Sequence, residues 1–285
     1  MKTTEDMIQL NRKQADFYDS IQQAEAEADH QGYAENEKAN LLTRAWAGLR
    51  YRQQEAVRAA GVEGLASEAQ MGWAAKKAGG DFLEIGCFSG SRITFRLAEL
   101  SGRYLGVELS SKAVASLNQK LLERGLDHKA KAAAVDFLTL DASHKFDVLY
   151  AHGVLHHFQN PQPLFERLAA MARPGALLIF SEPSAIHPLY QVVRTLYRPF
   201  QSDAAWEWPF TRRTVNALET YFEPLEGFGW GRWSLPLSVL TGLPKVGGFL
   251  RTAYLNRVRM EVKQGWHPTV WHNSYVTAMY RLRKQ

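Results

Sequence analysis

Short apolar segments alternate with helical patterns between residues 81 and 181, and this alternation restricts the fold more than any other feature of the chain. The apolar runs span residues 81–85, 104–108, 131–135, 146–150 and 176–181, and the helical patterns span residues 91–100, 111–123 and 161–172. Strand, helix and strand at such short intervals predict a parallel sheet with helices on both faces. The near-continuous run ALLIF at residues 176–180 fits a strand buried on both sides. The sequence therefore predicts an α/β fold.

The regions on either side of this core have different patterns. Residues 1–76 are predicted to form an N-terminal helical extension, in which a run of helix formers from residue 40 onward ends at Gly61 and Gly64. Residues 77–182 form the predicted ligand-binding core. Residues 183–285 begin with a stretch punctuated by Pro and Trp, which we interpret as a lid insertion after the fifth strand. The final strands of the same domain follow it.

Composition narrows the class of protein. Hydrophobic residues make up 46% of the chain and charged residues 22%, which is usual for a globular enzyme. No apolar run approaches the ~18 residues of a membrane span, and the first ten residues contain no secretory hydrophobic stretch, so a cytoplasmic protein is expected. The lone Cys87 can form no internal disulfide, and no Cys/His cluster has zinc-ligand spacing, so no metal is expected.

The net charge of +5 is unevenly distributed. From residue 244 onward there are eight Lys and Arg residues and a single acid, Glu261. One interpretation is a solvated basic surface that faces the acidic first forty residues. The other is a peripheral contact of the basic C-terminal region with an anionic membrane surface or an acidic substrate. Because no arginine-rich or RNP-type signature is present, nucleic acid is not the expected partner. The sequence gives no indication of the oligomeric state.

The segment DFLEIGCFSG at residues 81–90 carries the strongest local signal. It ends a predicted strand and leads into a helix, and glycines at such a turn let the backbone approach a ligand that a Cβ would obstruct. The following helix offers free N–H groups and the positive end of its dipole. Taken alone the signal is weak, because glycine-rich turns also bind dinucleotides or simply reverse the chain.

Acids at the next strand ends make the signal more specific. Glu108 closes the second strand, where a carboxylate can accept hydrogen bonds from both hydroxyls of a ribose. Asp136 closes the third strand, where it can bind an adenine amino group while Phe137 packs against the ring. The fourth strand ends in the histidine-rich turn HGVLHH at residues 152–157. Because ligands of open α/β sheets bind at the carboxyl ends of the strands, these four ends predict a site for one nucleoside-bearing ligand.

The ordered set FLEIGCFSG, GVELS, VDF and FDVLYAHGVLHHF resembles the class I S-adenosylmethionine-dependent methyltransferases, in particular the small-molecule group that acts on quinones and natural products. The resemblance covers residues 80–182 well and extends more loosely to NRKQADFYDS and PFTRRTVNALETYF. It implies a Rossmann-like sheet of seven mostly parallel strands, with an antiparallel last strand near residues 274–282. It also implies S-adenosylmethionine as cofactor and S-adenosylhomocysteine as product.

The resemblance also assigns a cofactor site, position by position. The glycine-rich loop would cradle the methionine part, Glu108 would bind the ribose, and Asp136 would hold the adenine amino edge. The cofactor-binding residues that it implies are Tyr18, Glu84, Gly86, Cys87, Phe88, Gly90, Glu108, Leu109, Asp136, Phe137 and His152. Phe88 stands where the family usually has a glycine, so its side chain must point away from the cofactor or cover it.

A dinucleotide site fits less well. The fingerprint G-x-G-x-x-G is broken at Phe88 and Ser91. An acid at Glu84 is unfavourable beside a pyrophosphate but compatible with a methionine ammonium group. We therefore expect in-line methyl transfer to a small apolar or aromatic molecule, with O-methylation favoured. A methyltransferase acting on RNA and a non-catalytic cofactor-binding partner protein remain as alternatives.

A hydroxyl acceptor calls for a general base. His157 and, after it, His156 are the catalytic candidates, and Glu182 and His187 follow. An aromatic acceptor pocket is predicted from Trp206, Trp208, Phe210, Trp230 and Trp233. The segment from Glu182 to Phe210 is expected to form a mobile cover, whose short helix would pack its apolar face on a second helix. The residues of these two faces are Leu189, Val192, Val193 and Leu196, and Val246, Phe249, Leu250 and Tyr254.

Overall fold

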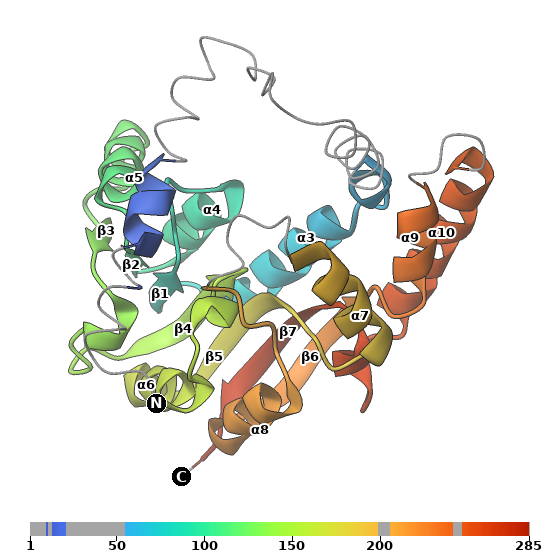
Figure 1. The fold of residues 1–285 in the computed structure, drawn as a ribbon. Coiled ribbons are helices and arrows are strands. Elements are labelled where there is room, and N and C mark those ends of the chain that lie inside the picture. Colours follow the sequence, from blue (N-terminus) through green and yellow to red (C-terminus); the bar gives the residue numbers. More distant parts are fainter. Residues whose placement is uncertain (1–9, 11–12, 21–54, 199–205, 242–246, 285) are drawn as a thin grey trace.

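A computed structural model describes residues 10, 13–20, 55–198, 206–241 and 247–284 of the protein (Figure 1). A seven-stranded sheet forms its centre, with the strand order β3-β2-β1-β4-β5-β7-β6. The strands are β1 Asp81–Ile85, β2 Arg103–Glu108, β3 Ala130–Ala134, β4 Phe146–His152, β5 Ala172–Pro183, β6 Phe222–Trp230 and β7 Tyr275–Leu282. Strands β1 to β5 are parallel, and β7 is antiparallel to both β5 and β6. The predicted Rossmann-like sheet with an antiparallel last strand is confirmed.

Helices cover both faces of this sheet, as the alternating pattern predicted (Figure 1). The helices are α3 Val62–Ala75, α4 Arg92–Leu100, α5 Ser111–Glu123, α6 Pro161–Met171, α7 Pro188–Tyr197, α8 Arg212–Tyr221, α9 Ser234–Thr241 and α10 Gly247–Lys263. Buried side chains of α3, α4 and α5 form one core cluster with one face of the sheet. Those of α6 and α8 form a second cluster with the opposite face. The two clusters hold the strand ends that carry the site in fixed positions.

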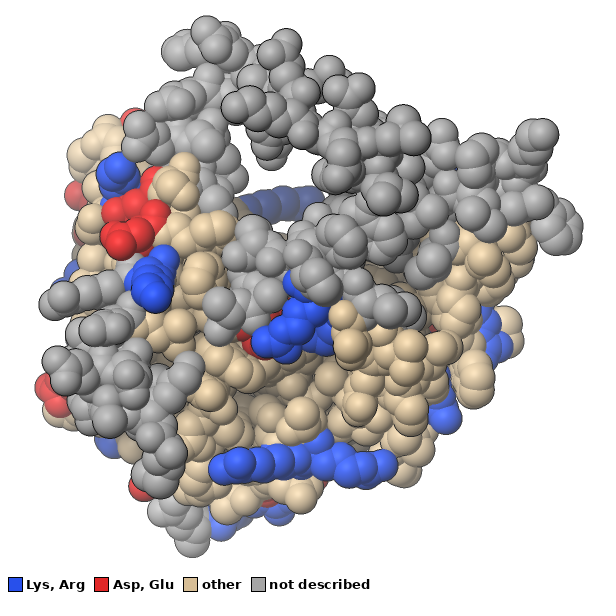
Figure 2. Space-filling view, viewed as in Figure 1, with Lys and Arg blue, Asp and Glu red and all other residues tan. Residues whose placement is uncertain are grey.

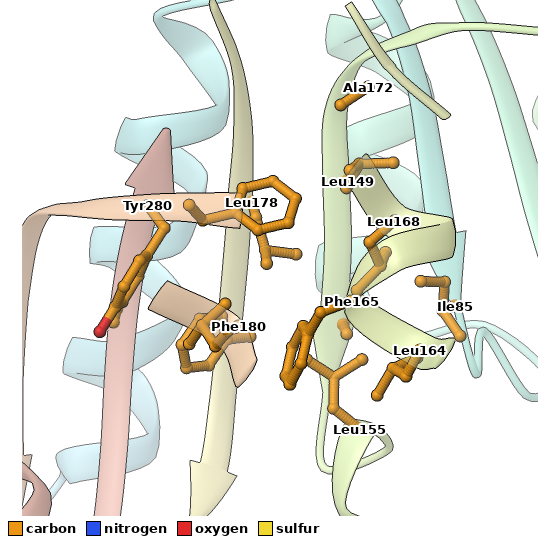
Figure 3. Packing of buried hydrophobic residues seen from close by; sticks show 14 of the residues in the cluster. Ile85, Leu149, Leu155, Leu164, Phe165, Leu168, Ala172, Leu178, Phe180 and Tyr280 are labelled. Carbon is orange, nitrogen blue, oxygen red and sulfur yellow. The ribbon is translucent and has the colours of Figure 1, made fainter. Parts of the chain in front are cut away.

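Helix α6 shows how local sequence and packing agree (Figure 3). It begins where the Asn160 side chain accepts a hydrogen bond from the backbone N–H of Gln162, with Pro161 at the first helical position. Leu164 and Leu168, one turn apart, are at most 1% exposed and pack against the sheet. Burying each such leucine stabilises the fold by about 2 kcal/mol. The helix is therefore fixed beneath the turn that follows β4.

Two glycines were predicted to end the N-terminal helical run, and only one of them does so in the structure. Gly61 adopts a left-handed conformation with φ of 67° and precedes α3, so the predicted break in the helical run falls there. Gly64 lies inside the first turn of α3 and ends no helix. The reason is that Gly61 alone supplies the backbone conformation that ends one helix and admits the next. Residues 40–54 of the predicted run lie outside the described residues.

The C-terminal helices do not pack as predicted. Tyr254 of α10 is buried beside Val62 of α3 and Phe228 of β6, so it belongs to a third core cluster rather than to a face over the ligand site. The short helix predicted in the insertion is present as α7. The side chains of Val193, Leu196, Val246 and Phe249 lie outside what the structure describes. Within its described part, none of the helices has the length and apolar character that a membrane crossing demands.

Candidate active site

A cavity opens at the carboxyl ends of β1, β2 and β4. The strand order reverses its direction between β1 and β4, and ligands of open α/β sheets bind at such a switch point. The structure brings together nine of the predicted site residues in the lining of this cavity: Tyr18, Gly86, Phe88, Glu108, Leu109, Asp136, Phe137, His152 and His157. The remaining lining is mostly apolar. The strand ends thus meet around one cavity, as the sequence predicted.

The loop after β1 turns sharply at three residues with positive φ, Gly86, Phe88 and Gly90. Gly86 has φ of 71°, and a Cβ added there would lie 2.7 Å from a methyl of Val154, so the loop passes close to the turn after β4. Phe88 has φ of 43° and is the non-glycine residue with positive φ in the described chain. Its ring lies 6.3 Å from that of Tyr18. Of the two orientations that the sequence left open, Phe88 takes the one that covers the cavity.

Three residues of the same motif, Glu84, Cys87 and Gly90, do not line the cavity, and their contact with a cofactor stays a prediction. Glu84 is buried and accepts hydrogen bonds from the hydroxyls of Tyr104 at 2.6 Å and Thr94 at 3.0 Å. Burial raises the pKa of Glu84 to about 7 against the opposing effect of these bonds. The buried Cys87 side chain points to β2, and Gly90 packs against α5.

Backbone hydrogen bonds fix the position of the Glu108 carboxylate, which still has room to accept a hydrogen bond from the cavity. Its Oε1 accepts hydrogen bonds from the backbone N–H groups of Leu109 at 2.7 Å and Ser110 at 3.2 Å. Its Oε2 accepts one from the N–H of Phe88 at 3.2 Å, which ties the β2 loop to the β1 loop. Burial raises the pKa of Glu108 despite these bonds. Because a carboxylate has about four acceptor sites, capacity remains for hydroxyl donors in the cavity.

An apolar slot lies beside Glu108. Leu109 after β2 and Phe137 and Leu138 after β3 line it. Asp136 stands at its edge, two residues beyond β3, and accepts a hydrogen bond from the N–H of Leu138 at 2.9 Å, which begins the short 3₁₀ helix Phe137–Thr139. This arrangement suits a flat, largely apolar ring with a polar edge.

A helix at residues 13–20 lies beside α5 (Figure 1), and its Gln14 and Tyr18 line the cavity. Asp19 accepts hydrogen bonds from the Ser110 hydroxyl and from the Lys112 N–H, so it sits at the N-terminus of α5, where a negative charge is stabilised by the helix dipole. Phe17 packs on Trp206 with ring centroids 5.3 Å apart. The N-terminal helix therefore contacts both α5 and the segment after α7.

His157 joins that helix to the core. Its Nδ1 lies 2.9 Å from the carbonyl oxygen of Trp206, and its Nε2 lies 3.3 Å from the Tyr18 hydroxyl. Because a carbonyl only accepts, Nδ1 carries the proton and Nε2 accepts from the Tyr18 O–H. Burial and the neighbouring His156 lower the pKa of His157 to about 4. The ring lines the cavity as a neutral imidazole, and its role as a base stays a prediction.

His156 is placed differently from His157, and its surroundings do not favour the predicted role as a base. Its Nδ1 lies 2.6 Å from Glu182, its Nε2 lies 3.8 Å from Glu207, and it does not line the cavity. These carboxylates outweigh burial and raise the pKa of His156 to about 9, so the ring is an imidazolium at neutral pH. Glu182 is fully buried and also accepts from the N–H groups of Val154 and Leu155. Neither group is available to a substrate.

The aromatic residues that were predicted to form an acceptor pocket do not lie around one pocket. Phe210 is fully buried and stacks on Trp271 in the core, and Trp233 is half exposed next to His187. His187 itself caps α7 by accepting from the N–H of Leu189, so its Nδ1 lone pair is occupied. None of the five predicted aromatics is among the described residues that line the cavity: Trp206, Trp208, Phe210, Trp230 and Trp233.

Two glutamines belong to the site but were missed by the sequence interpretation. Gln14 of the N-terminal helix lines the cavity and is 5% exposed. Gln70 of α3 is fully buried and contacts residues of both β4 and β5. For Gln70, the only sequence signal was that a glutamine stands on the buried side of a helix whose buried side is otherwise apolar. That signal does not predict a partner, because the contacts span 80 residues or more.

Comparison with known proteins agrees with this geometry. Residues 83–178 match the family model of a methyltransferase domain. The ubiquinone biosynthesis O-methyltransferase of Nitrosospira multiformis is 30% identical over 107 residues, which are 38% of this chain and 44% of that protein. The protein of the same name from Azoarcus is 32% identical over 106 residues, 36% of this chain and 44% of the relative. The chain thus spans less than half the length of these relatives.

Solved structures share the fold at low sequence identity. A geranyl diphosphate C-methyltransferase from Streptomyces coelicolor, in complex with S-adenosyl-L-homocysteine, has a TM-score of 0.50 at 15% identity, covering 75% of each chain. The cyclopropane synthase MmaA2 from Mycobacterium tuberculosis has a TM-score of 0.52 at 14% identity, covering 76% of this chain and 83% of that chain. Residues 83–178 are thus similar to a methyltransferase domain, and the sequence similarity of this part of the chain is to ubiquinone biosynthesis O-methyltransferases.

Proposed function

We propose that this protein transfers the methyl group of S-adenosylmethionine to a hydroxyl group of a small molecule. The observation that carries the proposal is Glu108, whose carboxylate faces the cavity at the end of β2 while backbone N–H groups fix its position. The O-methyltransferase names of the relatives support an oxygen acceptor. A cytoplasmic location is part of the proposal, since the buried Cys87 is a free thiol.

The cavity residues fit the proposed cofactor. Glu108 would accept hydrogen bonds from the ribose hydroxyls, and the slot at Leu109 and Phe137 would take the adenine, with Asp136 at its amino edge. Phe88 and Tyr18 would cover the methionine side. The Glu84 carboxylate is engaged with Tyr104 and Thr94, so it supports the loop rather than the ligand.

When bound, S-adenosylmethionine supplies an activated methyl group that is ready for in-line displacement. The residues of this chain contribute alignment and exclusion of water. The N-terminal helix excludes water by closing over the cavity through Tyr18 and His157. The β1 loop and the turn after β4, which touch at Gly86 and Val154, hold the two reacting sides of the cavity at a fixed separation.

The alternatives receive less support. Figure 2 shows Lys and Arg side chains in separate places on the face that it presents, so the described part of that face offers no continuous basic track for RNA. A non-catalytic partner protein has no need of a cavity that combines ribose-type and adenine-type contacts. The small-molecule activity is therefore the one we retain.

Peripheral membrane contact belongs to the proposal as a second element. Trp233 before α9 and Met260 on α10 are large exposed hydrophobic residues, and Arg251 and Arg259 on α10 are exposed bases. Exposed apolar groups beside bases favour an anionic lipid surface. Cosedimentation with vesicles that contain anionic lipid is expected, and equal recovery with neutral vesicles would contradict an electrostatic contact.

Calorimetry with S-adenosylhomocysteine tests the proposed function. Glu108→Ala is expected to weaken binding by about 1–3 kcal/mol, because charge-assisted hydrogen bonds to the ligand are lost. Glu99→Ala is the matched control, since Glu99 is an exposed glutamate paired with Arg96 on α4. Unchanged affinity in a folded Glu108→Ala protein would remove Glu108 from the site, and absence of binding by the unaltered protein would contradict the proposed function.

A further inference from the structure

Three histidines lie at the end of β4 and in the turn after it, and they differ in what their ring nitrogens contact. His156 lies between two carboxylates, and His157 uses Nε2 to contact Tyr18 of the N-terminal helix and Nδ1 to contact the Trp206 carbonyl. His152, the last residue of β4, lines the cavity and has an exposed side chain. Its hydrogen-bonding contacts with the described residues all involve Nδ1. Nε2 of His152 is thus the histidine nitrogen that remains available to a ligand in this turn.

A buried glutamine fixes which nitrogen of His152 carries the proton. The Gln70 Nε2 donates to the Ser181 hydroxyl at 3.1 Å, and that hydroxyl lies 2.6 Å from the hydroxyl of Thr277. This leaves the amide oxygen of Gln70 on the other side, where it accepts from the Tyr150 hydroxyl at 3.1 Å and lies 3.4 Å from Nδ1 of His152. An amide oxygen only accepts, so Nδ1 carries the hydrogen and the lone pair is on Nε2.

The charge state of His152 agrees with this arrangement. Although the His152 side chain reaches the surface, the surrounding protein removes much of the hydration of the ring and so lowers its pKa, while Glu182 of β5 and Glu63 of α3 act in the opposite direction and are outweighed. The hydroxyl of Tyr150 on β4 is neutral, since burial raises its pKa far above the physiological range. Tyr275 of β7, whose hydroxyl lies near Gly153, is also neutral because burial raises its pKa. The imidazole of His152 is therefore unprotonated at Nε2 at neutral pH.

We propose that His152 is the general base of the reaction, and that Gln70 is the positioning residue that sets its tautomer. This inference rests on the proposed function and deepens it, because a base at this place selects acceptors that carry an ionisable hydroxyl, such as phenols and catechols. The acceptor oxygen forms a bond to the methyl carbon while the carbon–sulfur bond breaks and its electron pair stays on sulfur. The hydroxyl proton moves to Nε2, and the resulting imidazolium releases it to solvent.

Nitrogen-detected NMR of the histidine rings tests the tautomer without turnover. With ¹⁵N-labelled histidine at pH 7.5, His152 is expected to carry its proton on Nδ1 and to titrate below pH 6.5. Gln70→Leu is expected to give a mixture of the two tautomers. A proton on Nε2, or an imidazolium at pH 7.5, would overturn the proposal.

Turnover with catechol and methyl-labelled S-adenosylmethionine tests the role itself. His152→Asn is expected to lower kcat by about 100-fold or more, as for loss of a general base, and its affinity for S-adenosylhomocysteine is measured in parallel to separate loss of turnover from loss of cofactor binding. Gln70→Glu is expected to move the acid limb of the kcat profile to higher pH, because a carboxylate beside Nδ1 stabilises the imidazolium. His128→Asn, at an exposed histidine after α5, is the control with unchanged turnover.

Different results would contradict the proposed function and the proposed role of His152. An unaltered protein that binds no S-adenosylhomocysteine contradicts the proposed function. An unaltered protein that methylates catechol, together with a His152→Asn protein of equal kcat, contradicts only the role of His152. An acid limb that does not move in Gln70→Glu contradicts the positioning role of Gln70.

Discussion

Two strand ends of this sheet carry glutamates with almost the same backbone contacts and opposite surroundings. Glu108 after β2 accepts hydrogen bonds from three backbone N–H groups, and Glu182 near the end of β5 accepts from three as well. Glu108 lines the cavity, whereas Glu182 is 0% exposed and bonds to the His156 ring. The first carboxylate retains acceptor capacity for a ligand, and the second uses its capacity within the protein.

The two glutamates thus belong to two regions. Glu108 belongs to the cavity, and Glu182 belongs to a group of charged residues outside its lining, which we call the bracing side. On the bracing side, Arg194 of α7 pairs with Glu207 at 2.7 Å, and Glu207 lies 3.8 Å from His156, which bonds to Glu182. Charges of alternating sign thus connect α7 to the end of β5. Buried charges are stable only when paired in this way, so the bracing side stabilises the turn that carries His152 and His157.

The largest effect is expected on the bracing side. Glu182→Ala should lower the free energy of unfolding by about 3–5 kcal/mol, because it leaves His156 as a buried cation and three N–H groups without their acceptor. Urea denaturation at pH 7.5 measures this change. Glu223→Ala, which removes an exposed pair with Arg281, is the control, and it should leave the free energy of unfolding nearly unchanged because solvent screens the pair. A loss in Glu182→Ala no larger than the control would show that Glu182 does not brace the turn.

A second effect is expected in the pH dependence of stability. The pKa of His156 is about 9 in the folded protein and 6.5 in the unfolded chain, so its stabilising contribution is complete below pH 6.5 and is lost as pH rises through 9. The loss is on the order of 3 kcal/mol between these limits. His156→Gln should flatten the fall in unfolding free energy measured by urea denaturation at pH 6.5 and pH 9. Equal slopes in both proteins would contradict the imidazolium assignment.

The smallest effect concerns the contact between the covering helix and the core. Tyr18→Phe should weaken S-adenosylhomocysteine binding by about 0.5–1.5 kcal/mol, because the hydrogen bond to His157 is lost while the ring still covers the cavity. Isothermal titration calorimetry measures the change. Tyr221→Phe removes a hydroxyl that accepts from the exposed Gln162 and should leave the affinity unchanged. Equal affinities in all three proteins would show that this bond does not hold the cover.

The sequence predicted the cavity residues best where a suitable residue type stands at the end of a strand or in the turn after it. Gly86, Glu108 and Asp136 were assigned because glycine at a turn and acids at consecutive strand ends are local features that the fold brings to one edge. Glu84 satisfied the same criteria and proved to face α4 and β2. His156 and His157 are adjacent in sequence, yet one is an imidazolium and the other neutral, because their charged neighbours come from other elements.

Local sequence patterns were enough to predict the order of strands and helices, the parallel core and the edge of the sheet at which the cavity opens. These follow from hydrophobic periodicity, glycine turns and caps, which act over a few residues. Only the tertiary structure decided which polar groups face the cavity. Gln70 meets His152 across 82 positions and Tyr18 meets His157 across 139, and such pairings set proton positions and pKa values. Their physical basis is burial, since a polar group removed from water must take whichever partner packing supplies.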